Sequence, residues 1–182
     1  LDHSDKMPEW QLQFFRNVGC SQSALADMAE SSYDYFRKAV TPLPPQVHSV
    51  QAGQEIRIGE DDWQVIVGQG HSPEHLCLFN HKTRVLISGD QILPRITPHI
   101  GLHASEPAAN PLQLYLDTLA NFDHLPNDTL VLPAHGLPFY RLHPRLAFLR
   151  QHHAERLALL EEFCSEPTRV LSTLKVMFQR EL

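Results

Sequence analysis

Cysteine is scarce in this sequence, with three residues in 182. Cys20, Cys77 and Cys164 lie far apart, form no CxxC pair and leave one thiol unpaired in any disulfide scheme. This pattern excludes the small disulfide-stapled domains of secreted proteins and a cysteine-rich structural zinc site. It predicts a reducing compartment, and we therefore expect a cytoplasmic protein.

Long apolar runs are also missing. No stretch approaches the ~20 apolar residues that span a bilayer, and no basic segment followed by an apolar one opens the sequence. We therefore expect no membrane partner. Hydrophobic residues nevertheless make up 42% of the chain, which is enough to build the core of one globular domain.

The sequence has no overall excess of positive charge. Its formal net charge is -6, and residues 1–140 carry 8 Lys and Arg against 16 Asp and Glu. Residues 141–182 are mildly basic, with 7 Lys and Arg against 5 Asp and Glu. This allows a nucleic-acid partner near that end, although a domain dedicated to nucleic acid usually shows a stronger basic surface.

Hydrophobic periodicity predicts helices at both ends of the chain and strands between them. Helical spacing of apolar residues occurs at 8–18, from Ser21 to beyond residue 30, at 144–163 and at 168–179. Short β-rich segments predict strands at 55–58, 63–67, 76–79, 84–88 and 129–132. Asn110 and Pro111 open a further helix before the last strand. This order predicts an α/β fold in which helices cover at least one face of a sheet.

The sequence does contain three potential metal ligands in similar positions. His71, Asp90 and His135 each come shortly after a predicted strand and next to a glycine or shortly after a proline. Side chains at the ends of strands can meet at one edge of a sheet, and two imidazoles with a carboxylate suit Zn²⁺, Mn²⁺ or Fe. Each residue alone could be an ordinary turn or capping residue. The threefold repetition favours a metal site.

Three segments resemble motifs of one family. GHSPEH at 70–75, VLISGD at 85–90 and LVLPAHG at 130–136 are similar, in order and separation, to the third, fourth and fifth motifs of the metallo-beta-lactamase superfamily. The resemblance is greatest to the branch with a C-terminal winged helix, which includes beta-lactamase-like endoribonucleases and glyoxalase II-like hydrolases. It implies the C-terminal part of an αβ/βα four-layer sandwich in residues 1–143 and the helices of a partial winged helix in residues 144–182.

By this resemblance, His71 ligates a first metal ion, Asp90 bridges two ions and His135 ligates the second, with a metal-bound hydroxide as the nucleophile. Zn²⁺ is the implied metal, two ions per complete site, and Mn or Fe are alternatives. The family's first motif, HxHxDH, is absent from the sequence. We therefore expect that the N-terminal half of the fold is missing, that the winged helix is incomplete, and that this chain is inactive and holds at most one metal ion weakly.

Other polar residues near these motifs are candidates for supporting roles. Arg95 and His99 follow Asp90 in a loop that should border the pocket, so we predict that they contact the substrate. Glu74 or His75 could orient a metal ligand by hydrogen bonding. An ordinary surface position is the alternative for all four.

The leading prediction is a metal-dependent hydrolase of a small thioester or ester, favoured by the negative net charge. RNA phosphodiester cleavage is an alternative because of the winged-helix resemblance and the basic C-terminal segment. A non-catalytic scaffold that has lost its metals is another. Apolar strand faces left uncovered by a missing layer would also predict a homodimer.

Overall fold

The computed structural model describes residues 6–30, 41 and 44–178, in two compact units. The first unit contains the described residues up to Val47, residues 103–107 and those from Glu155 onward. The second contains His48–Leu102 and Ala108–Ala154. The predicted division into domains of residues 1–143 and 144–182 stays a prediction.

The first unit is helical. It contains the whole of α1 (Glu9–Asn17), α2 (Gln22–Glu30) and α6 (Val170–Phe178). It also contains the last turns of α5 (Leu142–Phe163), from Glu155 onward. The Ser21 hydroxyl accepts a hydrogen bond of 3.2 Å from the amide of Ala24 and caps the start of α2. The predicted helices are confirmed here, and the part expected beyond Glu30 lies outside the described residues. The identity of α5 and α6 as a winged helix stays a prediction.

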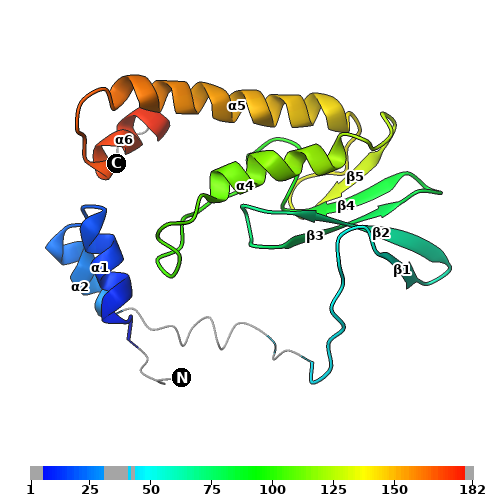
Figure 1. The fold of residues 1–182 in the computed structure, drawn as a ribbon, viewed down its shortest axis with the longest axis horizontal. Helices are drawn as coiled ribbons and strands as arrows, with labels where there is room; N and C mark the ends of the chain where they lie inside the picture. Colours follow the sequence, from blue (N-terminus) through cyan, green and yellow to red (C-terminus); the bar gives the residue numbers. More distant parts are fainter. Residues whose placement is uncertain (1–5, 31–40, 42–43, 179–182) are drawn as a thin grey trace. The chain divides into compact units, whose positions relative to one another are not determined.

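The second unit is built on a five-stranded sheet with the order β1-β2-β3-β4-β5 (Figure 1). Its strands are β1 (Glu55–Ile58), β2 (Asp61–Gly68), β3 (His75–Asn80), β4 (Val85–Gly89) and β5 (Leu130–Pro133). The first four strands pair antiparallel, and β5 pairs parallel with β4. All five predicted strands are confirmed, with small differences at their ends.

The parallel pairing of β4 and β5 requires a crossover connection, which α4 (Pro111–Thr118) and the short 3₁₀ turn η1 (Leu119–Phe122) provide. The Asn110 side chain accepts a hydrogen bond of 3.1 Å from the amide of Gln113, and Pro111 occupies the first turn. These are the capping roles that the sequence predicts for Asn and Pro.

The core of this unit lies between one face of the sheet and the helices. Figure 1 shows α4 and the first half of α5 over that face. The buried residues that meet there are Ile66, Cys77, Phe79, Leu86 and Val131 from the strands, Tyr115, Leu119 and Phe122 from α4 and η1, and Leu142, Leu146 and Leu149 from α5. The spacing of the three α5 leucines places them on one side of the helix. The predicted α/β fold is confirmed.

The opposite face of the sheet is apolar as well. Because side chains alternate along a strand, this face carries Val67 and Leu76, which are paired across β2 and β3, and Leu78 and Ile87, which are paired across β3 and β4. Leu76 and Ile87 remain 45% and 39% exposed. Strands that are apolar on both sides are typical of a sheet covered on both sides.

None of the helices among the described residues is both long and apolar enough to span a bilayer. The three cysteines are free thiols, with Cys77 buried and Cys164 exposed.

Candidate metal centre and adjoining pocket

The three predicted metal ligands lie at the same edge of the sheet. β2 and β4 run in the same direction because each is antiparallel to β3, and β5 is parallel to β4. Their carboxyl ends therefore meet at one edge, which carries His71 after β2, Asp90 after β4 and His135 after β5. The structure brings these side chains together, and their role as metal ligands stays a prediction.

Asp90 stands between the two imidazoles. His71 Nε2 lies 3.6 Å from Asp90 Oδ2, and His135 Nε2 lies 3.3 Å from Asp90 Oδ1. Each imidazole therefore faces a different oxygen of one carboxylate. The side chains of His71 and Asp90 are 27% and 26% exposed and that of His135 is 69% exposed, so solvent and solutes can reach all three.

The ring of His71 is oriented by the backbone. Its Nδ1 lies 2.8 Å from the carbonyl oxygen of His99. A carbonyl can only accept a hydrogen bond, so Nδ1 carries a proton and Nε2 is the ring nitrogen directed toward Asp90. Metal-ligating histidines are usually held in this way. His99 thus contributes its backbone here, while contact of its side chain with substrate stays a prediction.

His75 holds the backbone of Asp90 in place. Its Nε2 accepts a hydrogen bond of 3.1 Å from the Asp90 amide, and its Nδ1 lies 3.3 Å from the Ser72 hydroxyl. Burial, and after it the charge of His71, lowers the pKa of His75, which favours the neutral ring that this acceptor role requires. Glu74, the other residue considered for such a role, is exposed.

Gly89 allows His75 to come this close to the end of β4. The φ of Gly89 is 53°, and a Cβ at this position would lie 2.3 Å from His75 Nε2. Any larger residue would be strained and would displace the His75 ring. The turn from β4 into Asp90 therefore depends on glycine.

The segment that follows Asp90 is anchored by residues that the sequence did not single out. Arg145 of α5 donates from Nε to the carbonyl of Leu93 and from Nη2 to the carbonyl of Ile96, both at 2.6 Å. The Tyr115 hydroxyl of α4 donates to the carbonyl of Gln91 at 3.2 Å. No sequence pattern reveals these contacts, because the acceptors are backbone atoms at distant positions.

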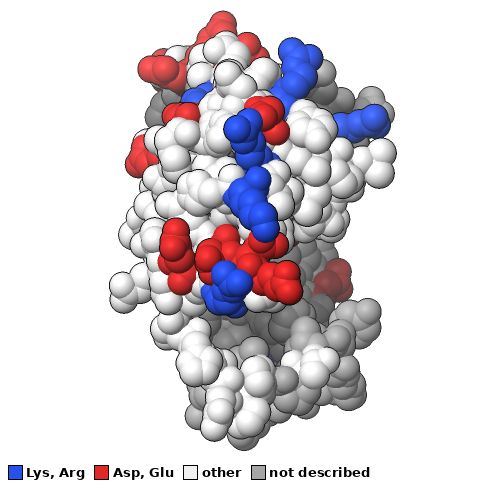
Figure 2. Space-filling model, turned by 90° about the vertical axis from the view of Figure 1, so that its right-hand side faces the viewer, with Lys and Arg blue, Asp and Glu red and all other residues white. Residues whose placement is uncertain are grey.

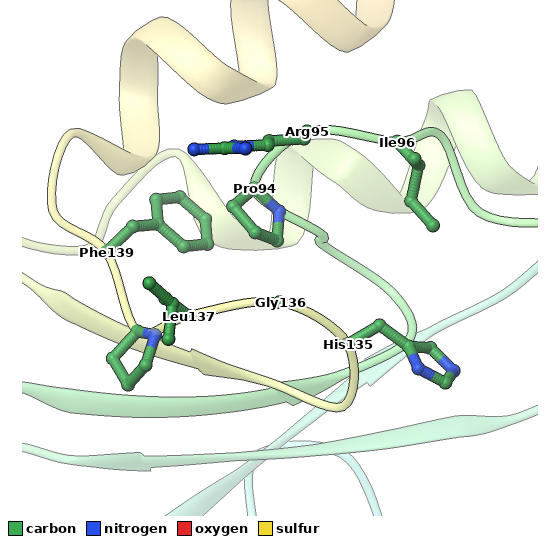
Figure 3. A pocket seen from close by; sticks show the side chains of 8 residues that line it. Pro94, Arg95, Ile96, His135, Gly136, Leu137 and Phe139 are labelled. Atoms are coloured by element: carbon green, nitrogen blue, oxygen red, sulfur yellow. The ribbon is translucent and has the colours of Figure 1, made fainter.

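A cavity of about 480 Å³ opens beside His135 (Figure 3). Two loops form its walls, residues 94–96 and 135–139. Arg95 lines the cavity, in agreement with its predicted place at the border of a pocket. Its contact with substrate stays a prediction.

The centre consists of pairs rather than a single cluster. Over residues 6–30, 41 and 44–178, no group of three or more His, Cys, Asp or Glu side chains is arranged to hold one metal ion. Instead, two imidazole–carboxylate pairs share Asp90. Each pair could supply two ligands to its own ion.

Comparison with known proteins supports this assignment of the fold. The sequence profile of the metallo-beta-lactamase superfamily matches residues 9–135. This chain belongs to the metallo-beta-lactamase superfamily. The match ends at His135, the last of the three candidate ligands.

Two curated relatives of this superfamily member are similar in sequence. An uncharacterized protein of Aquifex aeolicus is 32% identical over 94 residues, which are 52% of this chain and 43% of the relative. The probable metallo-hydrolase YqjP of Bacillus subtilis is 24% identical over 147 residues, which are 76% of this chain and 44% of the relative. The chain thus spans less than half the length of the curated relatives it matches.

Solved structures show the same fold. A beta-lactamase domain protein from Burkholderia ambifaria is 36% identical and superposes with a TM-score of 0.77, over 92% of this chain and 48% of that one. A metallo-beta-lactamase family protein from Thermus thermophilus superposes with a TM-score of 0.73 over 94% of this chain and 54% of that one. At 22% identity, the second likeness concerns the fold alone.

Proposed function

We propose that this protein is a metal-dependent hydrolase that acts on a thioester or ester and uses His71, Asp90 and His135 as metal ligands. Membership of the superfamily supports hydrolysis in general. The observation that carries the assignment of the centre is the hydrogen bond from His71 Nδ1 to the His99 carbonyl, because it leaves Nε2 free to face Asp90.

The distances in the centre fit divalent cations. Two ligands about 2.0–2.1 Å from one tetrahedral zinc ion are about 3.3 Å apart. The observed nitrogen–oxygen distances of 3.3 and 3.6 Å are close to this value, and 3.6 Å is too long for a hydrogen bond. Zn²⁺ fits such nitrogen and oxygen donors, and Mn²⁺ or Fe are compatible with them. We propose that in the complete centre each pair would hold one ion and that Asp90 would contribute one carboxylate oxygen to each.

The side chains of the centre would have distinct tasks. Divalent cations, when bound, supply Lewis acidity and lower the pKa of bound water toward neutrality. Asp90 would hold the two cation sites together and offset their mutual repulsion. The His99 carbonyl keeps the donor nitrogen of His71 in place, and His75 fixes the backbone from which Asp90 projects.

The surface charge of the sheet unit favours a thioester or ester over RNA. Its basic side chains are largely paired with acidic ones, as in Arg57–Asp62, Lys82–Asp61, Arg84–Asp128 and Arg150–Asp123. Figure 2 shows basic and acidic side chains intermixed on the face in view. Such a surface offers little attraction to a polyanion.

RNA phosphodiester hydrolysis is the second candidate, favoured by the 7 Lys and Arg against 5 Asp and Glu in residues 141–182. A salt-sensitive affinity for single-stranded RNA, with no hydrolysis of thioesters, would support it.

The three free thiols also support the proposal of a reducing, cytoplasmic location.

The metal assignment is tested by titrating the chain with Zn²⁺ and Mn²⁺ and measuring affinity and stoichiometry by calorimetry. We expect Asp90→Asn to weaken binding roughly 10-fold or more, because the bridging carboxylate loses its charge. His81→Ala is the matched control, since His81 bonds Gln64 on the sheet surface and should leave binding unchanged.

Hydrolysis is measured on the natural gene product that carries the same substitutions, with acyl thioesters and esters as substrates. We expect Asp90→Asn and chelators to abolish turnover and His81→Ala to retain it. Metal content and turnover that are both unaffected by substitution of His71, Asp90 and His135 together would instead support a non-catalytic scaffold. That this chain alone is inactive stays a prediction.

A further inference from the structure

The cavity beside His135 has walls that are fixed by the rest of the unit. Arg145 holds the first wall through its hydrogen bonds to the carbonyls of Leu93 and Ile96, both at 2.6 Å. The second wall is tied to β5 by two backbone hydrogen bonds between Val131 and Phe139, of 2.8 and 3.0 Å. The cavity is therefore formed without a ligand.

The two walls meet at Gly136. The φ of this residue is 88°, and a Cβ here would lie 2.8 Å from Cγ of Pro94. The backbone of one loop thus packs against the proline ring of the other more closely than a larger residue would allow. This contact sets the separation of the walls.

The lining is apolar apart from His135 and the charged side chain of Arg95. Carbon surface comes from Pro94, Ile96, Leu137, Pro138 and Phe139, and the permanent charge is that of Arg95. Ile96 and Leu137 are 61% and 78% exposed, so their apolar surface is open to a ligand. Among the described residues, none forms a hydrogen bond or an ion pair with Arg95. The guanidinium is therefore available to an anion.

The charged group and the candidate metal ligand lie in different parts of the pocket. Figure 3 shows the imidazole of His135 pointing away from Leu137 and Phe139, whereas the Arg95 guanidinium extends above Pro94 toward the Phe139 side. A ligand that spans this distance would need one group near His135, a carbon chain between the walls and an anionic group near Arg95.

We infer that this pocket binds an apolar acyl chain that carries a carboxylate at its far end, with the ester or thioester bond placed near His135. The volume of about 480 Å³ lies within the range of about 300–1,000 Å³ that is typical of small-molecule sites. As a statement about substrate, this inference rests on the proposed hydrolase function. As a statement about binding, it does not.

Binding is tested first without metal, so that it does not depend on hydrolysis. Octanoate is titrated into the chelator-treated chain and followed by calorimetry, with butyrate and octan-1-ol as comparison ligands. We expect octanoate to bind more tightly than either, because butyrate fills less of the apolar cavity and octan-1-ol lacks the charge. Equal affinities for the three would overturn the inference.

Two variants separate the apolar and charged parts of the site. Leu137→Gln is expected to weaken octanoate binding roughly 5-fold, while the matched control Leu114→Gln on α4 leaves it unchanged. Arg95→Gln is expected to weaken it roughly 3-fold without affecting octan-1-ol, whereas Arg57→Gln on β1 has no effect. Wild-type affinity for octanoate in either pocket variant would overturn the inference.

The substrate role is tested on the natural gene product with thioesters that differ in the acyl group. We expect a lower KM for a long acyl chain with a terminal carboxylate than for acetyl, and Leu137→Gln should raise that KM with little change in kcat. A KM that does not depend on the acyl group would overturn the substrate class. Octanoate binding that persists while Asp90→Asn leaves metal binding unchanged would refute the proposed metal centre but support the pocket.

Discussion

Among single residues, protonation of the imidazole nitrogens decides what the candidate centre can do. His71 and His75 both carry the proton on Nδ1, because a carbonyl oxygen accepts from the first and the Asp90 amide donates to Nε2 of the second. Both Nε2 atoms are therefore directed at Asp90, one at its carboxylate and one at its backbone. The sequence contains twelve histidines, and the hydrogen bonds of His71 and His75 fix which nitrogen of each of these two rings faces Asp90.

Cys77 provides a residue-level test of the core. Burial raises the pKa of its thiol to about 12, so the thiol stays protonated and unreactive in the folded protein. We expect iodoacetamide at pH 8 to modify the exposed Cys164 and to reach Cys77 only after unfolding, as measured by peptide mass spectrometry. Rapid modification of Cys77 in the folded chain would contradict the packing of β3 against the helices.

The same shift in pKa predicts a pH dependence of stability. A folded-state pKa above that of the unfolded thiol, about 8.5, means that the contribution of Cys77 is fully present below pH 8.5 and is lost as the pH rises toward 12. We expect the free energy of unfolding to fall less steeply above pH 8.5 in Cys77→Ala than in the wild type. The free energy of unfolding is measured by urea denaturation at each pH. If it falls equally steeply in Cys77→Ala and in the wild type, the assigned effect of Cys77 is refuted.

For the elements, the important feature is the way two helices hold a loop that leaves the sheet. The Ser88 hydroxyl donates to the carbonyl of Ile92 at 2.8 Å, and the contacts from Tyr115 and Arg145 follow along the same segment. Backbone carbonyls between β4 and Ile96 therefore accept hydrogen bonds from side chains of β4, α4 and α5. These hydrogen bonds determine the positions of Asp90 and of the pocket wall formed by residues 94–96.

Substitution of Arg145 tests the anchoring. Arg145→Met removes two charge-assisted hydrogen bonds but keeps much of the side-chain volume, so we expect a loss of about 2 kcal/mol in the free energy of unfolding. Arg57→Met, which removes an exposed ion pair with Asp62, should cost less than about 0.5 kcal/mol. Equal effects of the two substitutions in thermal denaturation would show that Arg145 is an ordinary surface residue.

At the scale of the whole molecule, the sheet has two apolar faces, and the helices of the same unit, α4 and the first half of α5, cover one of them. The exposed side chains on the other face include Leu76 and Ile87, at 45% and 39% exposure. Burial of such side chains is worth roughly 25 cal/mol per Å², so this face should bind another apolar surface.

A homodimer through this face stays a prediction. We expect the molar mass from light scattering to rise with the concentration of the chain, and Leu76→Lys with Ile87→Lys to suppress that rise. Leu114→Lys on α4 is the control and should leave the rise in molar mass unchanged. A mass that stays that of a monomer at all concentrations would refute the prediction.

The order of helices and strands could be predicted from the sequence because periodicity is local. Apolar residues two apart in β2 and β3, or three and four apart in α5, show which side of each element faces a core. Local turn chemistry likewise predicted the cap at Asn110 and the placement of His71, Asp90 and His135 beyond strand ends. The α/β fold and the edge that carries the candidate centre were accessible in this way.

Only the tertiary structure decided how those side chains act together. The bond between His71 and the His99 carbonyl joins positions 28 apart, and the bond from Arg145 to the Leu93 carbonyl joins positions 52 apart. No local pattern encodes such contacts, because they depend on where backbone carbonyls point after the sheet and helices have packed. The apolar pocket beside His135 has the same origin, since its two walls come from separate loops that meet only in the folded chain.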